Sequence, residues 1–397
     1  MRIAAVGLYA AAGLGLGLYL VQLVSTFLHL RQRRASGTSA PGISILKPLC
    51  GVDDELEANL TAFATLAYPH YELLLGVCST ADRAWPLACA LARRWPGRVR
   101  VVVQRGEPGL NPKVNQLITL AAVARHDVVV ISDSNVRPPD GYLEEIAAAL
   151  SDGNVGLVTH PVVGIGERRL GSLFDNLHLG SSVGPGMVAT KRVARRDLVV
   201  GKSMALRKTD LATLGGFEAV KDVLAEDWVL GKWISERLGK RVVVAHRPVY
   251  NVSAQRSVRD FLHRYRRWSV IHKKAVGLPV YLAQLVLNPT LLALGAAVLT
   301  ATSDGWLGFG FLAVGKAGYD VAATGVLRGP GGLGATTLSV LAAPLKDLVL
   351  GWAWLHGLTH STVSWRHNRL RVCAGTRLEP LWAQPELDEG AYPEVAG

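Results

Sequence analysis

Carboxylate side chains stand at the ends of short apolar runs in this sequence. Asp133 closes the run 128–132, Asp82 lies shortly after another run, and Glu226 and Asp227 begin a helical pattern. An Asp that closes a buried strand can present its carboxylate to a metal-bound diphosphate, because Mg²⁺ and Mn²⁺ prefer hard oxygen ligands. Each motif alone also has a local explanation, since an Asp often ends a strand in a turn and an acidic pair often caps a helix.

A basic and aromatic element provides a second kind of chemistry. Arg264 and Arg267 are three residues apart, which places them on one face of a helix, and Trp268 follows directly. Two guanidinium groups suit a leaving diphosphate, and an indole ring suits stacking against a sugar or an acceptor. A basic stripe with a Trp anchor beside a membrane is the common alternative. The carboxylates and this element, in this order, are more specific than any one motif.

An alternation of apolar and amphipathic segments must position these residues. Apolar runs cover 43–46, 72–78, 99–103, 127–131, 155–159 and 242–245. Amphipathic stretches cover 55–66, 85–94, 113–124, 141–150 and 227–238. The alternation predicts an α/β domain over about 35–274, with a largely parallel sheet and helices on both faces. Ligands of such sheets bind beyond the C-terminal strand ends, where the polar clusters stand.

The composition indicates a membrane protein. The 397 residues carry a formal net charge of +12 and are 49% hydrophobic but only 19% charged, against about 25% in ordinary soluble domains. Residues 3–30 contain no charge, a run longer than the ~20 residues that a spanning helix needs. Because three arginines follow within 31–34, the positive-inside rule predicts an N-terminal anchor over 1–34 and a cytoplasmic domain after it. A cleaved signal peptide would have a shorter apolar stretch, of about 7–15 residues.

The C-terminal part is apolar again. Residues 275–303 and 348–365 carry no charge, and a basic tail begins at 366. We expect transmembrane or re-entrant helices over 275–365, with two full spans and one re-entrant or interfacial segment around 334–365. This arrangement leaves the tail over 366–397 cytoplasmic.

Four charged residues lie at apolar depth in this part of the chain. Charges there are costly and are usually paired or functional, and we expect pairing. The four are Lys316, Asp320, Lys346 and Asp347.

Several function classes are disfavoured. The basic surplus is spread over membrane flanks without a recognisable nucleic-acid module, so an anionic bilayer surface explains it better than nucleic acid does. The four cysteines lack C-x-x-C spacing, which argues against a zinc site or a disulfide scaffold. No G-x-G-x-x-G follows the first apolar run, which argues against a dinucleotide site.

With these motifs in order, the chain resembles the ceramide glucosyltransferases, glycosyltransferase family 21, which are related to the inverting glycosyltransferases of family 2. The shared pattern is an Asp after the second strand, a DxD-like Asp, a Glu-Asp pair and an R-x-x-R-W element. The resemblance runs from about residue 3 to 376. Further matching stretches are 45–49, 51–53, 68–69, 111–115, 215–217, 364–366 and 369–371.

The resemblance implies a GT-A fold facing the cytosol, a UDP-glucose donor and a ceramide-like lipid acceptor taken from the bilayer. It assigns Asp227 as the general base of a single-displacement reaction with inversion. The donor site would be formed by Lys47, Pro48, Asp82, Lys113 and Asp133. The diphosphate and the acceptor would be bound by Arg264, Arg267 and Trp268.

The resemblance also implies a divalent cation, Mg²⁺ or Mn²⁺, held by Asp133 and Asn135. Asn135 replaces the second Asp of a full DxD motif; its amide oxygen can ligate a metal but adds no charge. Val183 stands where the animal enzymes carry a His linked to donor binding. These departures bear on metal affinity and on the identity of the donor.

Other classes remain open at this point. A related bacterial lipid glycosyltransferase could use a hopanoid or another membrane alcohol with a UDP-N-acetylhexosamine. A processive polysaccharide synthase would need more membrane spans. A non-catalytic scaffold would be expected to lose the acidic positions, and this chain keeps them. The preferred interpretation is a multi-pass enzyme of a bacterial inner membrane.

Overall fold

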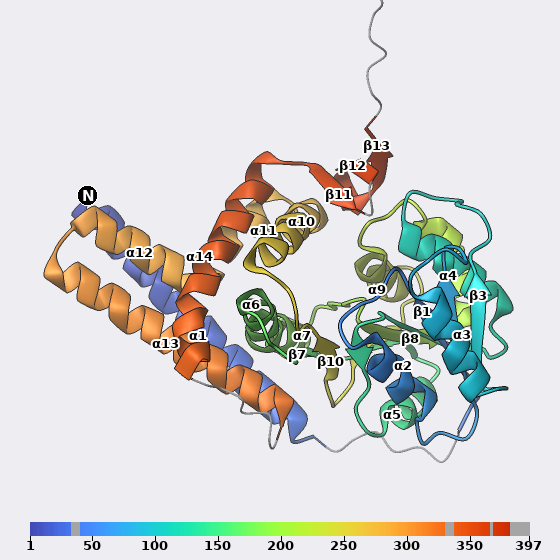
Figure 1. Cartoon of the computed structure of the whole chain (residues 1–397). Helices are drawn as coiled ribbons and strands as arrows, with labels where there is room; N and C mark the ends of the chain where they lie inside the picture. Colours follow the sequence, from blue (N-terminus) through green and yellow to red (C-terminus); the bar gives the residue numbers. More distant parts are fainter. Residues whose placement is uncertain (33–39, 330–336, 366–367, 382–397) are drawn as a thin grey trace, which may run out of the picture.

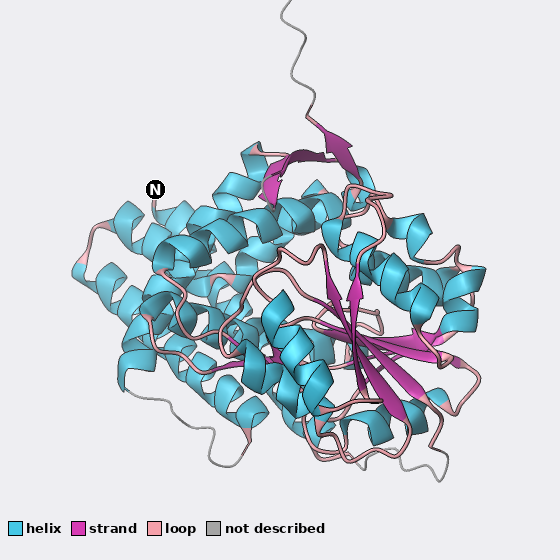
Figure 2. Ribbon diagram, turned by 45° about the vertical axis from the view of Figure 1, so that its right-hand side comes forward, coloured by secondary structure: helices cyan, strands magenta, loops and turns pink. Residues whose placement is uncertain are grey.

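The computed structural model describes residues 1–32, 40–329, 337–365 and 368–381. A seven-stranded sheet forms the centre of the α/β domain, in the order β3-β2-β1-β4-β8-β6-β9 (Figure 2). Its strands are β1 (Ile43–Pro48), β2 (Tyr71–Val77), β3 (Val99–Val103), β4 (Val128–Ser132), β6 (Val155–Thr159), β8 (Ser203–Arg207) and β9 (Arg241–Val244). All six predicted strands are present, within a few residues of their expected bounds.

Strand β8 departs from the prediction. The strands β3, β2, β1 and β4 run parallel to one another, as do β6 and β9, whereas β8 runs antiparallel to both β4 and β6. The sheet is therefore largely but not wholly parallel. The apolar core of β8 is only Met-Ala-Leu between polar ends, too short a signal for periodicity to identify.

Helices cover both faces of this sheet, as predicted. Alternate strand residues enter two separate cores: Ile45 and Val130 face one, while Leu46 and Ile131 face the other. The first core is closed by α2 (Leu56–Ala64), α3 (Trp85–Arg94) and α5 (Tyr142–Leu150). The second is closed by α4 (Pro112–Val123), α8 (Lys208–Thr213), the 3-10 turn η2 (Phe217–Val220) and α9 (Glu226–Glu236).

Two smaller sheets flank the domain. Strands β5 (Val136–Arg137), β10 (Val249–Val252) and β7 (Val162–Ile165) pair beside the central sheet. Near the C-terminus, β11 (Thr362–Trp365), β12 (Asn368–Val372) and β13 (Leu378–Pro380) form a hairpin sheet with a short 3-10 turn, η4 (Ala374–Thr376). This last sheet packs on the long helix α10 (Val258–Val276) through a small apolar cluster.

The apolar helices gather on the other side of the molecule (Figure 1). They are α1 (Arg2–Leu30), α11 (Leu278–Ala283) with the turn η3 (Gln284–Leu287), α12 (Pro289–Thr300), α13 (Ser303–Arg328) and α14 (Thr337–Thr359). Between them and the sheet lie α6 (Leu170–His178), the π-helical turn η1 (Leu179–Val183) and α7 (Gly184–Arg192). Gly15 of α1 lies against the backbone of η3, where a side chain would clash with Val286.

Two described helices are long and apolar enough to cross a membrane, Arg2–Leu30 and Leu338–Thr359. The pair Leu278–Leu287 and Pro289–Thr300 is bent by 78° and could count as a third, broken crossing. The bend therefore lies in the segment expected to span fully, whereas most of the segment expected to be re-entrant forms one continuous helix. Asn288 and Pro289 account for the break, because Pro cannot continue the preceding helix.

The expected pairing of the buried charges is confirmed. The ammonium of Lys346 lies 2.9 Å from carboxylate oxygens of both Asp320 and Asp347. Lys316 lies 2.5 Å from Asp320 and 3.8 Å from Asp347. We call these four residues the helix charge cluster. Each ion has two partners of opposite charge, which is what makes burial of such groups tolerable.

Candidate active site

Two of the predicted acidic clusters, Asp133 and the Glu226–Asp227 pair, meet at one edge of the sheet. Asp133 directly follows β4. Ser132 of β4 pairs with Ser203 of β8, so Lys202, which directly precedes β8, is brought beside Asp133. The antiparallel strand thus places a cation at the C-terminal end of a parallel strand, where sequence analysis expects the ligand.

Two lysines hold the Asp133 carboxylate. Lys113, in the first turn of α4, lies 3.0 Å from Oδ1, and Lys202 lies 3.0 Å from Oδ2. Burial alone would raise the pKa of Asp133, but the two ammonium groups hold that pKa below its usual range. Asp133 is therefore a fixed anion.

Lys113 also connects Asp133 to the second acidic cluster. Its ammonium lies 2.8 Å from Oε1 of Glu226, which precedes Asp227 in the first turn of α9. Asn111 caps the N-terminus of α4: its side chain accepts hydrogen bonds from the backbone N–H groups of Lys113 and Val114. Strand end and helix start thus share one ion network.

The pKa of Asp227 at this edge is raised. Its carboxylate accepts hydrogen bonds from the backbone N–H groups of Gly201 and Trp228, the latter at 2.8 Å. Burial and the neighbouring Glu226 charge raise the pKa of Asp227 to about 6, against the opposing effect of Lys113. A carboxylate with such a pKa is ionised at neutral pH and is more basic than an ordinary Asp, as a general base requires.

Lys47 and Pro48 are buried at the end of β1, next to the strand that carries Asp133. The Lys47 ammonium is fully buried, donates to the backbone carbonyl of Asp133 at 2.7 Å and lies 3.7 Å from the centroid of the Phe63 ring. Pro48 ends β1 in a buried position beside Gly76. These contacts support the backbone that presents Asp133.

Asp82 holds two loops together. Its Oδ1 atom accepts hydrogen bonds from the backbone N–H groups of Gly51 and Ala84, at 2.9 and 2.8 Å. No contact between Asp82 and the Asp133 network occurs within the described ranges. Its role in nucleotide binding stays a prediction.

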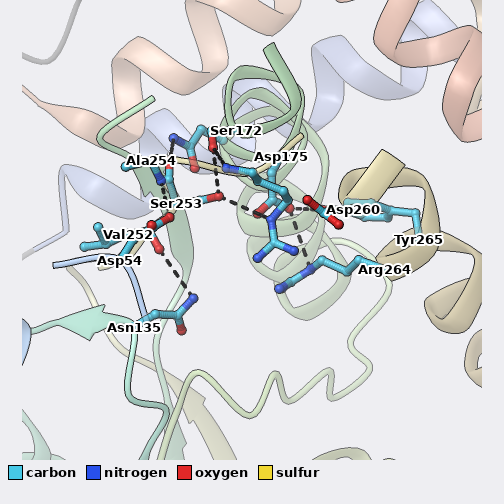
Figure 3. A network of polar contacts seen from close by, with 12 residues as sticks. Asp54, Asn135, Ser172, Asp175, Val252, Ser253, Ala254, Asp260, Arg264 and Tyr265 are labelled. Atoms are coloured by element: carbon cyan, nitrogen blue, oxygen red, sulfur yellow. Dashed lines mark hydrogen bonds and ion pairs between the residues drawn. The ribbon is translucent and has the colours of Figure 1, made fainter. Parts of the chain in front are cut away.

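The R-x-x-R-W element lies on α10, which begins with a capping box formed by Ser257 and Asp260. Arg264 lies 3.7 Å from Asp175 of α6 and stacks over the Trp268 ring at 4.7 Å, while Arg267 is half-buried one turn along. Figure 3 shows Arg264 and Tyr265 reaching Asp175.

The charge of Arg264 in this element influences the charged residues at the sheet edge. Burial lowers the pKa of Lys202, the charge of Asp133 opposes this shift, and the charge of Arg264 adds to it. Asp133 in turn contributes to the raised pKa of Arg264. The charges of Arg264, Asp133 and Lys202 therefore act on one another.

The expected metal ligands are already engaged. The Lys202 ammonium contacts both Oδ2 of Asp133, at 3.0 Å, and Oδ1 of Asn135, at 2.9 Å. Among the residues that the structure describes, no three His, Cys, Asp or Glu side chains are grouped to hold a metal. As arranged, these side chains do not fit a divalent metal ion, because the Lys202 ammonium already occupies the position between their oxygen atoms.

Sequence analysis missed two residues of this site. Lys202 is separated from every motif, and only the pairing of β8 with β4 brings it to Asp133. Asp175 lies inside an amphipathic helix, fully buried, where it also lies 3.5 Å from Arg256. A lone Asp within an apolar helix face was the available signal for Asp175, since such a residue is rarely buried without a partner.

Comparison with known proteins identifies the family of this chain. Residues 7–378 match the family described as Glycosyl transferase family 21. Ceramide glucosyltransferase 1 of Caenorhabditis elegans is 30% identical over 264 residues, which are 63% of this chain and 54% of that protein. Ceramide glucosyltransferase of Komagataella phaffii is 28% identical over 193 residues, covering 43% of this chain and 38% of that protein. The chain thus spans about half the length of the first of these relatives.

A solved structure shares the fold. The mannosyltransferase PcManGT from Pyrobaculum calidifontis, in complex with GDP-Man and Mn²⁺, matches with a TM-score of 0.52 and 18% identity, over 90% of this chain and 99% of that one. The α/β domain therefore has the GT-A fold predicted from the sequence. With nearly all of its length matched by the family, this chain belongs to glycosyltransferase family 21.

Proposed function

We propose that the protein transfers a hexose from a UDP-sugar, UDP-glucose in the first instance, to the primary hydroxyl of a ceramide-like membrane lipid, with inversion at the anomeric carbon. The observation that carries the proposal is Asp227, a carboxylate held by two backbone N–H groups, with a pKa of about 6, one lysine away from Asp133.

The reaction is a single displacement. Asp227 removes the proton from the lipid hydroxyl while the hydroxyl oxygen attacks the anomeric carbon and the bond to the diphosphate breaks. Glu226 keeps Asp227 basic, and Lys113 ties the base to the donor end of the site. Positioning of base and hydroxyl within hydrogen-bond reach accounts for a large part of such a rate enhancement.

The leaving diphosphate needs positive charge. Arg264 and Arg267 on α10 are the proposed partners, with Trp268 beside them for the sugar or the acceptor. Asp175 fixes the orientation of Arg264 from α6. Lys47, Pro48 and Asp82 shape the donor site through their backbone contacts. The divalent ion predicted at Asp133 and Asn135 does not fit these side chains as they are arranged, and no step here depends on it.

The membrane supplies the acceptor. Two described helices can cross a bilayer, and the apolar helices contact α10, the helix that carries the arginines. We place the catalytic domain on the cytoplasmic side of a multi-pass protein, where UDP-sugars are available. A nucleic acid plays no part.

The test is product identification. The full chain, purified in detergent, is incubated with a panel of UDP-sugars and with ceramide, hopanoid polyols and other membrane alcohols, and products are identified by mass spectrometry. Glucosylceramide from UDP-glucose is the expected product. A product from a hopanoid and UDP-N-acetylhexosamine would favour the alternative lipid glycosyltransferase, and no glycolipid from any pair would contradict the proposal.

A further inference from the structure

We infer that Lys202 is a built-in cation of the donor site: its ammonium occupies the position between Asp133 and Asn135 and binds the diphosphate of the donor, so that donor binding persists without a divalent ion. This inference rests on the proposed function, because it needs a nucleotide diphosphate as ligand.

The position of the ammonium is the first argument. It lies 3.0 Å from Oδ2 of Asp133 and 2.9 Å from Oδ1 of Asn135, the two side chains that would bridge a metal. A divalent ion bound to both oxygen atoms would lie about 2.0–2.6 Å from each. The ammonium and such an ion would therefore occupy the same space.

The construction around Lys202 is the second argument. The residue is 6% exposed and is fixed by the pairing of Ser203 with Ser132 in the sheet. Burial of a charged lysine costs desolvation free energy, and here the ion pair with Asp133 offsets this cost. The lysine is part of the sheet edge and not a surface side chain that happens to fall nearby.

The number of hydrogen-bond donors is the third argument. An ammonium has three N–H donors. Lys113 already meets three oxygen atoms, from Asp133, Glu226 and the Gly201 carbonyl. Lys202 meets two, and among the described residues no oxygen atom accepts a hydrogen bond from its third donor. A phosphate oxygen arriving at this edge would supply it.

The charge balance is consistent with this role. Arg264 lies within electrostatic range of Lys202, and the carboxylates of Asp133, Asp175 and Asp53 offset these two positive charges. A diphosphate between Lys202 and Arg264 would relieve their repulsion. It would also form charge-assisted hydrogen bonds with both.

The first measurement is UDP binding by calorimetry, using the full chain in detergent, in EDTA and in Mn²⁺. Wild type is expected to lose only a few-fold in affinity in EDTA. Lys202→Met should weaken UDP binding in EDTA by about 10–100-fold, as expected for one charged hydrogen bond, and Lys202→Arg should recover most of it. Lys208→Met is the matched control, because Lys208 follows the opposite end of β8 and only caps the Ala124 carbonyl.

The second measurement is Mn²⁺ binding in the absence of nucleotide, followed by electron paramagnetic resonance of the free ion. Removing a competing ammonium should increase Mn²⁺ affinity in Lys202→Met by at least about tenfold over wild type, since two like charges cannot share one position. A thermal unfolding curve checks that the variant is folded.

The outcomes separate this inference from the proposed function. Loss of all UDP binding by wild type in EDTA, or unchanged Mn²⁺ affinity in a folded Lys202→Met variant, would overturn the role of Lys202 and leave glycosyl transfer intact. Absence of UDP binding in both buffers would overturn both.

Discussion

The molecule holds two clusters of lysine and carboxylate side chains that look alike in composition but differ in closure. In the helix charge cluster both lysines are 0–1% exposed, and each carboxylate is shared between them. At the sheet edge the Asp133 side chain is 27% exposed, so this cluster is open to solvent. The first network is complete in itself, whereas in the proposed function the second is completed by a ligand.

The difference shows how the same ion pairs can serve stability or chemistry. In the helix charge cluster the hydroxyl of Thr290 donates to Asp347 at 2.7 Å, so a further carboxylate oxygen is satisfied. At the sheet edge, burial and the like charge of Glu226 raise the pKa of Asp227. In a closed network the charges stabilise one another within the protein. In an open network some charges stay available to interact with a bound substrate.

The largest expected effect falls on catalysis at the open cluster. Asp227→Asn keeps the size and one hydrogen-bond acceptor but cannot take a proton, so the rate of glycosyl transfer should fall by about 10²–10⁴-fold. UDP affinity should stay within a few-fold of wild type, because the amide still fits beside Gly201. Initial rates and calorimetry measure the two. Retained turnover would remove Asp227 from the role of base.

The next effect falls on stability at the closed cluster. Asp320→Ala leaves two buried ammonium groups with one carboxylate between them and should lower the free energy of unfolding by about 3–5 kcal/mol. Thermal unfolding in detergent measures it. Asp304→Ala, an exposed acid in the first turn of the same helix, is the control and should change little. Equal melting temperatures for both variants would contradict the closed arrangement.

A smaller effect is expected in the pH profile. Below a pKa of about 6 the Asp227 base becomes protonated, so kcat/KM should fall tenfold per pH unit as the pH decreases further. Glu226→Gln removes a charge that raises this pKa, so the acid limb should move to lower pH. The control is Glu236→Gln at the exposed end of the same helix. An acid limb that stays in place, or moves to higher pH, would contradict the coupling of the two acids.

The smallest effect is expected from replacing a whole ion pair. The double variant Asp320→Leu, Lys346→Met removes one anion and one cation from the helix charge cluster. Its melting temperature should lie much closer to that of wild type than the melting temperature of Asp320→Ala does. The corresponding double variant at the sheet edge, Asp133→Leu with Lys113→Met, should not recover UDP affinity. Recovery at both places would mean that the two clusters do not differ in function.

Much of the architecture followed from local patterns. The six predicted strands and five helices are present because alternating apolar runs and amphipathic stretches report burial on the two faces of a sheet. Strand β8 and the 78° bend between α11 and α12 could not be predicted in the same way. A three-residue apolar stretch carries too little periodicity. Pro289 marks the break in the sequence, but the size of the bend depends on how neighbouring helices pack.

The sequence by itself determined which residue types are available: the acids Asp133 and Asp227, the arginines of α10 and the apolar segments around them. Their local signals, strand ends and helix starts, span only a few residues and could be recognised directly. Only the tertiary structure decided that Lys202 contacts both Asp133 and Asn135 and that Asp175 pairs with Arg264. It also decided that four charges in the apolar helices neutralise one another. The physical reason is that ion pairs depend on distance in space, and strand order and helix packing bring together residues far apart in the chain.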